Sequence, residues 1–175
     1  MTQFGYFLTD VKRMVGRRKL RLVHIWLSRA FWGILSYRLE RGLYLMIPGI
    51  YGILRVPLIP LFNLFEMYSN IEIHYQANIQ GGLTILHPAM GVVISSEAVI
   101  GKNLTLTGGN VIGIKANYHE ERFIIGDNCN FGANATLIGP LILGHHISIG
   151  ASACVVHDCV TDHCILVGVP AKPIH

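Results

Sequence analysis

A six-residue repeat from Phe123 to Pro170 restricts the fold more than any other feature of this 175-residue chain. Large apolar side chains recur at every sixth position, interrupted only at Thr161: Ile125, Phe131, Leu137, Leu143, Ile149, Val155 and Val167. A second stripe lies two residues ahead of the first: Phe123, Cys129, Ala135, Leu141, Ile147, Ala153, Cys159 and Ile165. A period of six fits neither a helix face, which repeats about every 3.6 residues, nor an unbroken two-residue alternation. Short strands separated by turns satisfy it, so the sequence predicts a coil of strand repeats.

The repeat extends towards the N-terminus with two interruptions. The series runs backwards in steps of six, apart from one step of fourteen: Val111, Thr105, Val99, Ile85 and Ile79. The same step of fourteen separates Val111 from Ile125. Because fourteen is two repeats plus two residues, we expect one loop inside residues 89–96 and another inside residues 115–122. Loops that interrupt a regular scaffold commonly carry function.

The first third of the chain differs from the repeat in charge. Residues 1–66 contain ten Lys and Arg against three acidic residues. This balance indicates an anionic surface as a partner of the N-terminal region. Hydrophobic residues make up 51% of the chain and charged residues only 14%, which predicts surface hidden by other chains or by a membrane.

The N-terminal third has helical periodicity. A basic cluster follows Thr9 and Asp10, either of which is a plausible helix cap, and apolar residues from Leu20 to about Leu45 predict an amphipathic helix. The apolar segment after it contains several prolines and no uninterrupted window of about 20 apolar residues, so a conventional membrane span is not expected. We expect residues 1–68 to form a helical region that contacts the other chains of an oligomer, an anionic membrane surface, or both.

The four cysteines form no Cys-x-x-Cys pair, which favours reduced thiols and a reducing compartment. The N-terminus lacks a compact secretion signal. These features predict a cytoplasmic protein, and a peripheral position on the inner membrane remains open. Nucleic acid is not an expected partner, because the basic cluster belongs to no recognisable nucleic-acid-binding module.

The repeat, with Gly or Asn at its corners and the ending Val167-Gly-Val-Pro-Ala-Lys-Pro173, resembles the hexapeptide acyltransferase superfamily. The resemblance covers roughly residues 70–173. It implies a mainly β fold, a left-handed parallel β-helix over residues 69–175 following the N-terminal α-helical region. Members assemble as homotrimers, so a homotrimer is expected.

Within that superfamily, the segments Ile71 to His87 and Met90 to Val93 are similar to serine acetyltransferases and to polysaccharide enzymes such as colanic acid acetyltransferases. Glu72 and His87 keep the family's spacing of fifteen residues between a carboxylate and the catalytic histidine. The resemblance implies that His87 is the general base and that Glu72 orients it. The chemistry suits both groups, because neutral histidine takes a hydroxyl proton near neutral pH and a carboxylate on its far nitrogen stabilises the imidazolium.

The sequence departs from serine acetyltransferases around the acceptor. Leu86 replaces an aspartate that contacts the amino acid in that family, and an Arg-His pair aligns with Glu121 and Arg122, with His119 three residues before Arg122. Leu86, His119 and Arg122 are therefore the candidate acceptor-binding residues. A pocket without a carboxylate for the substrate ammonium should recognise serine poorly.

The resemblance implies acetyl-CoA as the donor, with its pantetheine arm along small residues at coil corners, here Gly113, Ala133 and Ala151. Lys172 is a candidate partner of the adenosine phosphate. No metal is expected, since adjacent histidines such as His145 and His146 would point to opposite faces of a strand and the ligand pattern of the γ-class carbonic anhydrases is missing.

Taken together, these features predict an acetyl-CoA-dependent O-acetyltransferase acting by direct transfer on a sugar hydroxyl in capsule, exopolysaccharide or O-antigen synthesis. A serine O-acetyltransferase of cysteine biosynthesis is the alternative within the same class. A non-catalytic β-helix that binds a partner is the alternative from a different class.

Overall fold

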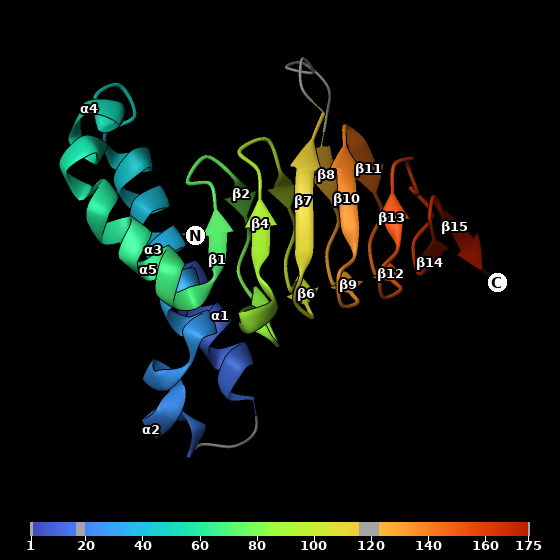
Figure 1. Ribbon diagram of the computed structural model, residues 1–175, viewed down its shortest axis with the longest axis horizontal. Coiled ribbons are helices and arrows are strands. Elements are labelled where there is room, and N and C mark those ends of the chain that lie inside the picture. Colours follow the sequence, from blue (N-terminus) through green and yellow to red (C-terminus); the bar gives the residue numbers. More distant parts are fainter. Residues whose placement is uncertain (1, 17–19, 116–122, 175) are drawn as a thin grey trace.

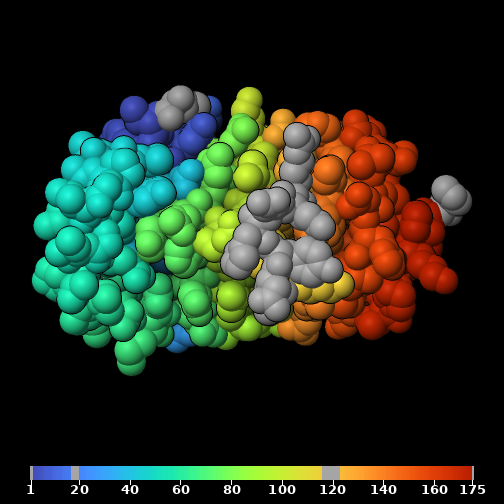
Figure 2. Space-filling model, turned by 90° about the horizontal axis from the view of Figure 1, so that it is seen from above, coloured from blue at the N-terminus to red at the C-terminus, as the bar shows by residue number. Residues whose placement is uncertain are grey.

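The computed structural model describes residues 2–16, 20–115 and 123–174. A helical region stands at one end of a parallel β-solenoid, and the coils of the solenoid follow one another towards the C-terminus (Figure 1). The predicted fold class, a left-handed β-helix with an N-terminal α-helical region, is confirmed. Figure 2 shows the helices gathered over one end of the stacked coils.

The helical region has short and long segments: α1 (Gln3–Val15), α2 (Arg21–His24), a 3-10 helix (Ile25–Leu27), α3 (Arg29–Met46), α4 (Tyr51–Arg55), a second 3-10 helix (Val56–Leu58) and α5 (Ile59–Ser69). The predicted helix over Leu20 to Leu45 is divided at Ser28, whose backbone is extended. The predicted cap at Thr9 or Asp10 is wrong. Thr2 caps α1 instead, since its hydroxyl accepts the N–H of Gly5 at 3.2 Å, and Asp10 is buried inside the helix. None of the described helices is long and apolar enough to cross a membrane.

Three sheets form the faces of the solenoid. The first contains β1 (Ile71–Ile73), β4 (Val92–Ile94), β7 (Asn110–Ile114), β10 (Thr136–Gly139) and β13 (Cys154–Val155). The second contains β2 (Asn78–Ile79), β5 (Val99–Ile100), β8 (Phe123–Ile125) and β11 (Leu141–Leu143). The third contains β3 (Thr84–Ile85), β6 (Thr105–Leu106), β9 (Asn130–Phe131), β12 (Ser148–Ile149), β14 (Ile165–Gly168) and β15 (Ala171–Ile174). All pairs are parallel except β14 with β15, which closes the last coil as a hairpin.

The inward stripe agrees with the sequence repeat at Ile79 and Ile85 of the first coil and again from β8 to β13, and it shifts by one residue between β5 and β7 and in β14. From Ile125 to Val155 the predicted side chains are buried. Between β5 and β7 the inward residues are Ile100, Leu106 and Ile112, whereas the predicted Val99, Thr105 and Val111 face outward or lie at the surface. In β14, Leu166 is inward and Ile165 is 45% exposed. Successive side chains of a strand point to opposite faces, so a loop of irregular length reverses the predicted facing of the strands up to the next irregular loop.

Helix α3 closes the open end of the first coil. That coil has no coil before it, so its carbonyl groups need donors from elsewhere. The Tyr37 hydroxyl donates to the carbonyl of Ala77 at 2.7 Å and accepts the N–H of Ile79 at 3.2 Å. Arg38 and Arg41 donate at 2.6–3.1 Å to four further carbonyls of this coil: Tyr75, Gln76, Ile79 and Gln80. The helical region is therefore joined to the solenoid by hydrogen bonds as well as by apolar packing.

Candidate active site

His87 lies on one edge of the solenoid, where the chain passes from the third sheet to the first. It follows β3 and precedes a 3-10 helix (Pro88–Met90) that leads into β4. This corner lengthens its coil, because Ile79 pairs with Ile100, twenty-one residues later, whereas Phe131 pairs with Ile149, eighteen residues later. The predicted first loop is present, but it lies mostly before residues 92–94, which form β4.

The backbone of the His87 corner is held by the residue that ends α5 and by the next coil. On one side, Nδ2 of Asn70 donates to the carbonyl of Ala89 at 3.0 Å. On the other side, a Cβ at Gly108 would overlap the carbonyl oxygen of His87, and Gly108 has φ +136°. Only glycine allows so close an approach in that conformation. The position of His87 therefore depends on the end of α5 and on the next coil, whose Thr107 carbonyl accepts the N–H of His87 at 2.8 Å.

Glu72 lies in the middle of β1 with an exposed side chain, next to Val93 of β4. It lines a cavity of about 160 Å³ formed by α5, β1 and the start of β4: Glu66, Asn70, Ile71, Glu72, Gly91, Val92 and Val93. Among the described residues, no nitrogen of His87 lies within 4.0 Å of a carboxylate oxygen of Glu72. Asn70 lines the cavity together with Glu72, and its side chain also bonds the carbonyl of Ala89 in the His87 corner. Glu72 and the His87 corner therefore share Asn70 as a neighbour, although Glu72 and His87 form no ion pair.

Glu66, at the end of α5, is a member of this cavity that the sequence reasoning missed. Burial raises the pKa of its carboxyl above the usual value, and the negative charge of Glu72 raises it further. His74, after β1, was also missed as a perturbed group. Burial and the charge of Arg55 lower the pKa of its imidazole, which stacks on Tyr75 with ring centroids 4.4 Å apart. Glu66 is only six residues before Glu72, but the sequence carries no motif that shows its carboxyl turned into the cavity beside β1.

The three predicted acceptor-binding residues are not equally described. Leu86 directly precedes His87, and its side chain is 54% exposed at the same corner. His119 and Arg122 lie outside the described residues. Because residue 86 is an exposed leucine, the position next to the candidate base carries no charged group that could bind an acceptor.

Two of the predicted donor-binding residues share the edge that carries His87. Ala133 follows β9 and Ala151 follows β12, and the N–H of Ser152 donates to the carbonyl of Ala133 at 2.8 Å. Gly113 lies in β7, where a Cβ would meet no heavy atom nearer than 3.8 Å within the chain. Lys172 belongs to β15 and pairs with Val167 in the final hairpin. The edge therefore presents small residues above the candidate base, and Lys172 lies at the far end of the solenoid.

The described residues contain no group of three or more His, Cys, Asp and Glu placed to hold a metal ion. The four cysteines have free thiols. The titratable groups described at the first coil and the end of α5 include the imidazoles of His74 and His87 and the carboxylates of Glu66 and Glu72. Such groups can accept and return a proton.

Comparison with solved structures gives a clear likeness over nearly the whole chain. Serine acetyltransferase of Neisseria gonorrhoeae has 28% sequence identity and a TM-score of 0.81, covering 98% of this chain and 67% of that protein. Soybean serine acetyltransferase has 26% identity and a TM-score of 0.80, covering 99% and 69%. Serine acetyltransferase of Brucella abortus strain S19, solved in complex with coenzyme A, has 21% identity and a TM-score of 0.76, covering 98% and 67%.

No protein-family model matches the chain, and no curated protein matches it in sequence. The structural likeness includes the helical region as well as the solenoid, because it extends over 98–99% of the chain. The architecture is thus that of the solved serine acetyltransferases.

Proposed function

We propose that the chain is an acetyl-CoA-dependent O-acetyltransferase in which His87 is the general base. The observation that carries the proposal is the likeness to serine acetyltransferases over nearly the whole chain, with 26–28% identity to two of them. The position of His87 at an irregular, firmly held corner supports the assignment. Acetyl-CoA as donor is supported by the neighbouring structure that contains coenzyme A.

The proposed reaction is a direct transfer. A ring nitrogen of His87 takes the proton of the acceptor hydroxyl while its oxygen attacks the thioester carbonyl. A backbone N–H stabilises the oxyanion that forms. The carbon–sulfur bond then breaks, and the leaving thiolate of CoA receives the proton from the imidazolium. Glu72 is the proposed positioning residue, and a rotation of exposed side chains is needed to bring its carboxylate to the imidazole.

Two acceptors compete within this proposal. The structural neighbours favour L-serine, since they are serine acetyltransferases. Leu86 favours a sugar hydroxyl of a capsular, exopolysaccharide or O-antigen precursor, because an apolar side chain offers nothing to a serine ammonium group. The comparisons support serine better, and the residue beside His87 supports the sugar.

A homotrimer is part of the same proposal. Val93 and Val111 lie side by side on the outer face of the first sheet and are each 39% exposed. Apolar side chains in a row on a sheet face are favourable sites for contact with another copy. We place the enzyme in the cytoplasm, where its donor is available.

The test follows thiol release from acetyl-CoA with L-serine and with sugar acceptors offered separately. His87→Ala should lower the rate by about 10²–10⁴-fold while the oligomer remains intact, because that is the usual contribution of a general base. His157→Ala, at another exposed histidine, is the matched control and should keep the rate. Full activity in His87→Ala would refute the assignment.

The acceptor is decided by a second variant. Leu86→Asp should raise the use of serine relative to sugar if position 86 controls the acceptor, because it provides a partner for the ammonium group. A non-catalytic β-helix predicts no binding of CoA. A rise in the melting temperature with CoA would exclude it, because a ligand that binds the folded state stabilises that state.

A further inference from the structure

The helical region exposes more apolar surface than the solenoid does. Most of the large hydrophobic side chains that are exposed among the described residues lie between Phe4 and Tyr68. On α3, Leu39, Leu43 and Met46 are 51%, 37% and 79% exposed. Their spacing of four and three residues places them on one side of the helix, opposite the side that binds the first coil. Apolar surface in a continuous stripe marks an interaction site.

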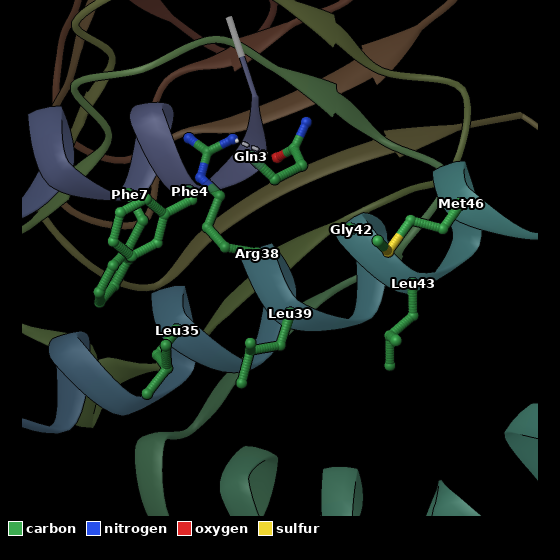
Figure 3. Close-up of a pocket in the computed structure, with 9 residues that line it drawn as sticks. All are labelled: Gln3, Phe4, Phe7, Leu35, Arg38, Leu39, Gly42, Leu43 and Met46. Carbon is green, nitrogen blue, oxygen red and sulfur yellow. Dashed lines mark hydrogen bonds between the residues drawn. The ribbon is translucent and has the colours of Figure 1, made fainter.

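Two hollows widen this stripe on either side of α3. One, of about 230 Å³, lies between α1 and α3, where Phe4 and Phe7 face Leu35, Leu39 and Leu43 (Figure 3). In the close-up Arg38 points towards Gln3, while Leu39 and Leu43 point away from it. The other hollow, of about 350 Å³, lies between α3 and α5, where Trp32 stacks on Phe65 with centroids 5.6 Å apart.

The three helices therefore share one apolar surface, which we call the three-helix face. It is defined by six exposed side chains: Phe4, Leu39, Leu43, Met46, Leu61 and Leu64. The side chains between them are half-buried and equally apolar, as with Leu35 and Phe65. The face is thus a broad surface rather than a groove for a single side chain.

The charges around the face have one sign. Within residues 2–16 and 20–69, no carboxylate side chain is exposed. Asp10 and Glu40 are buried and paired with Arg38 and Arg55, and Glu66 is half-buried. Every exposed charged group of the described helical region is therefore a cation.

Two exposed cations border the face. Lys12 follows Phe4 and Leu8 at intervals of four residues, so it lies on the same side of α1. Arg29 begins α3 one turn before Trp32, which lines the hollow between α3 and α5. A further tryptophan lies at this end, since the carbonyl of Trp26 accepts the Trp32 ring N–H at 2.6 Å. Tryptophan and cationic side chains beside apolar ones are the composition of surfaces that lie in the lipid headgroup region.

We propose that the three-helix face docks on an anionic phospholipid bilayer. The six apolar side chains enter the boundary between headgroups and acyl chains, and Lys12 and Arg29 contact lipid phosphates. Charge complementarity selects this occupant over a second copy of the chain, because pairing two such faces would bring cations against cations. The docking does not depend on the proposed transferase activity.

Docking would place the candidate active site close to the lipid. Helix α3 packs directly on the first coil through Tyr37, Arg38 and Arg41, and this coil carries Glu72 and ends at His87. If the proposed transferase function holds, this geometry favours an acceptor attached to a membrane lipid over a freely diffusing one.

The test measures co-sedimentation of the full chain with phosphatidylcholine vesicles and with vesicles that also contain phosphatidylglycerol. We expect binding to the anionic vesicles that weakens with added salt. Lys12→Gln and Arg29→Gln should each weaken it about fivefold, the usual effect of one basic residue near an anionic membrane. Leu39→Glu combined with Leu64→Glu should abolish it. Val160→Glu, the same change at a side chain 66% exposed at the far end of the solenoid, is the matched control and should bind normally.

Two results would overturn the proposal. The first is equal binding to neutral and anionic vesicles. The second is no binding to the anionic vesicles. If the Leu39→Glu, Leu64→Glu variant then also has a smaller assembly mass, the face is a contact between copies of the chain. The exposed Lys12 and Arg29 variants keep the test valid should the glutamate variant fail to fold, which circular dichroism would detect.

Discussion

The buried ion pair between Asp10 and Arg38 should control the stability of the junction between helices and solenoid. Asp10 is fully buried and accepts the N–H groups of Gly82 and Leu83 at 2.6 and 2.8 Å. Its other oxygen accepts Nε of Arg38 at 2.9 Å, and the Arg38 side chain is only 2% exposed. Asp10→Ala removes the carboxylate that accepts from all three groups. It leaves two backbone N–H groups without an acceptor and a guanidinium charge in the interior without a counter-charge.

The expected loss follows from these contacts. Breaking a buried ion pair costs about 3–5 kcal/mol, and each buried backbone N–H left without an acceptor adds to that loss. We therefore expect Asp10→Ala to lower the free energy of unfolding by at least about 3–5 kcal/mol. For a domain of ordinary stability this is a third or more of the total.

The assay is urea unfolding followed by circular dichroism at fixed protein concentration. Asp158→Ala is the control, because exposed Asp158 accepts a single N–H, from Ile142 at 2.8 Å, and should cost less than about 1 kcal/mol. The double variant Asp10→Ala, Arg38→Met should lose less than the sum of the two single changes by at least about 1 kcal/mol. Additive losses, or an Asp10→Ala change no larger than the control, would refute the reasoning.

Two further predictions concern the last coil and the acidic cavity. Leu166→Ala should lower the free energy of unfolding by about 2–5 kcal/mol, since Leu166 is buried, while Ile165→Ala should change it by under about 0.5 kcal/mol. If urea unfolding showed a larger loss for Ile165→Ala than for Leu166→Ala, Ile165 would be the inward residue, as the unshifted six-residue repeat predicts, and the observed register of β14 would be wrong. The folded-state pKa of Glu66 lies above its ordinary value of 4.5, so the folded protein holds a proton that the unfolded chain releases, and this contribution to stability is lost as the pH rises through the folded-state value. Glu66→Gln should therefore melt at a higher temperature than the parent near pH 7, and the difference should vanish near pH 4; a constant difference across that range would contradict the raised pKa.

Much of the solenoid could be predicted from the sequence because its core depends on a local pattern. The side chains of the middle coils, from Ile125 to Val155, pointed inward as the repeat predicted. The prediction failed beside irregular corners, where Ile112 replaced Val111 and Leu166 replaced Ile165. A count of residues does not show where an extra or missing residue is accommodated, and each such residue reverses the facing of the strand after it.

The candidate site could be predicted only in part. The spacing of Glu72 and His87 and the resemblance of their segments predicted both residues, and both belong to the first coil, Glu72 in β1 and His87 after β3. The sequence reasoning did not identify Glu66, which reaches the cavity from α5. It also did not identify Gly108, whose lack of a side chain allows the next coil to approach His87 closely. Both effects depend on how α5 and the second coil pack on the first coil, which the order of the residues does not show.

The sequence by itself determined the coiling of the chain and the separation of a basic helical region from a repeat, and it predicted a histidine and a carboxylate at a family spacing as the catalytic residues. These depend on periodicity and composition, which are properties of the chain read in order. The tertiary structure alone decided how the helices close the first coil, which of the charged groups are buried, and which apolar side chains remain exposed together. Asp10 and Arg38 look like any surface charges in the sequence, and only the packing of α1 and α3 on the first coil removes them from water and leaves cations alone on the outer face.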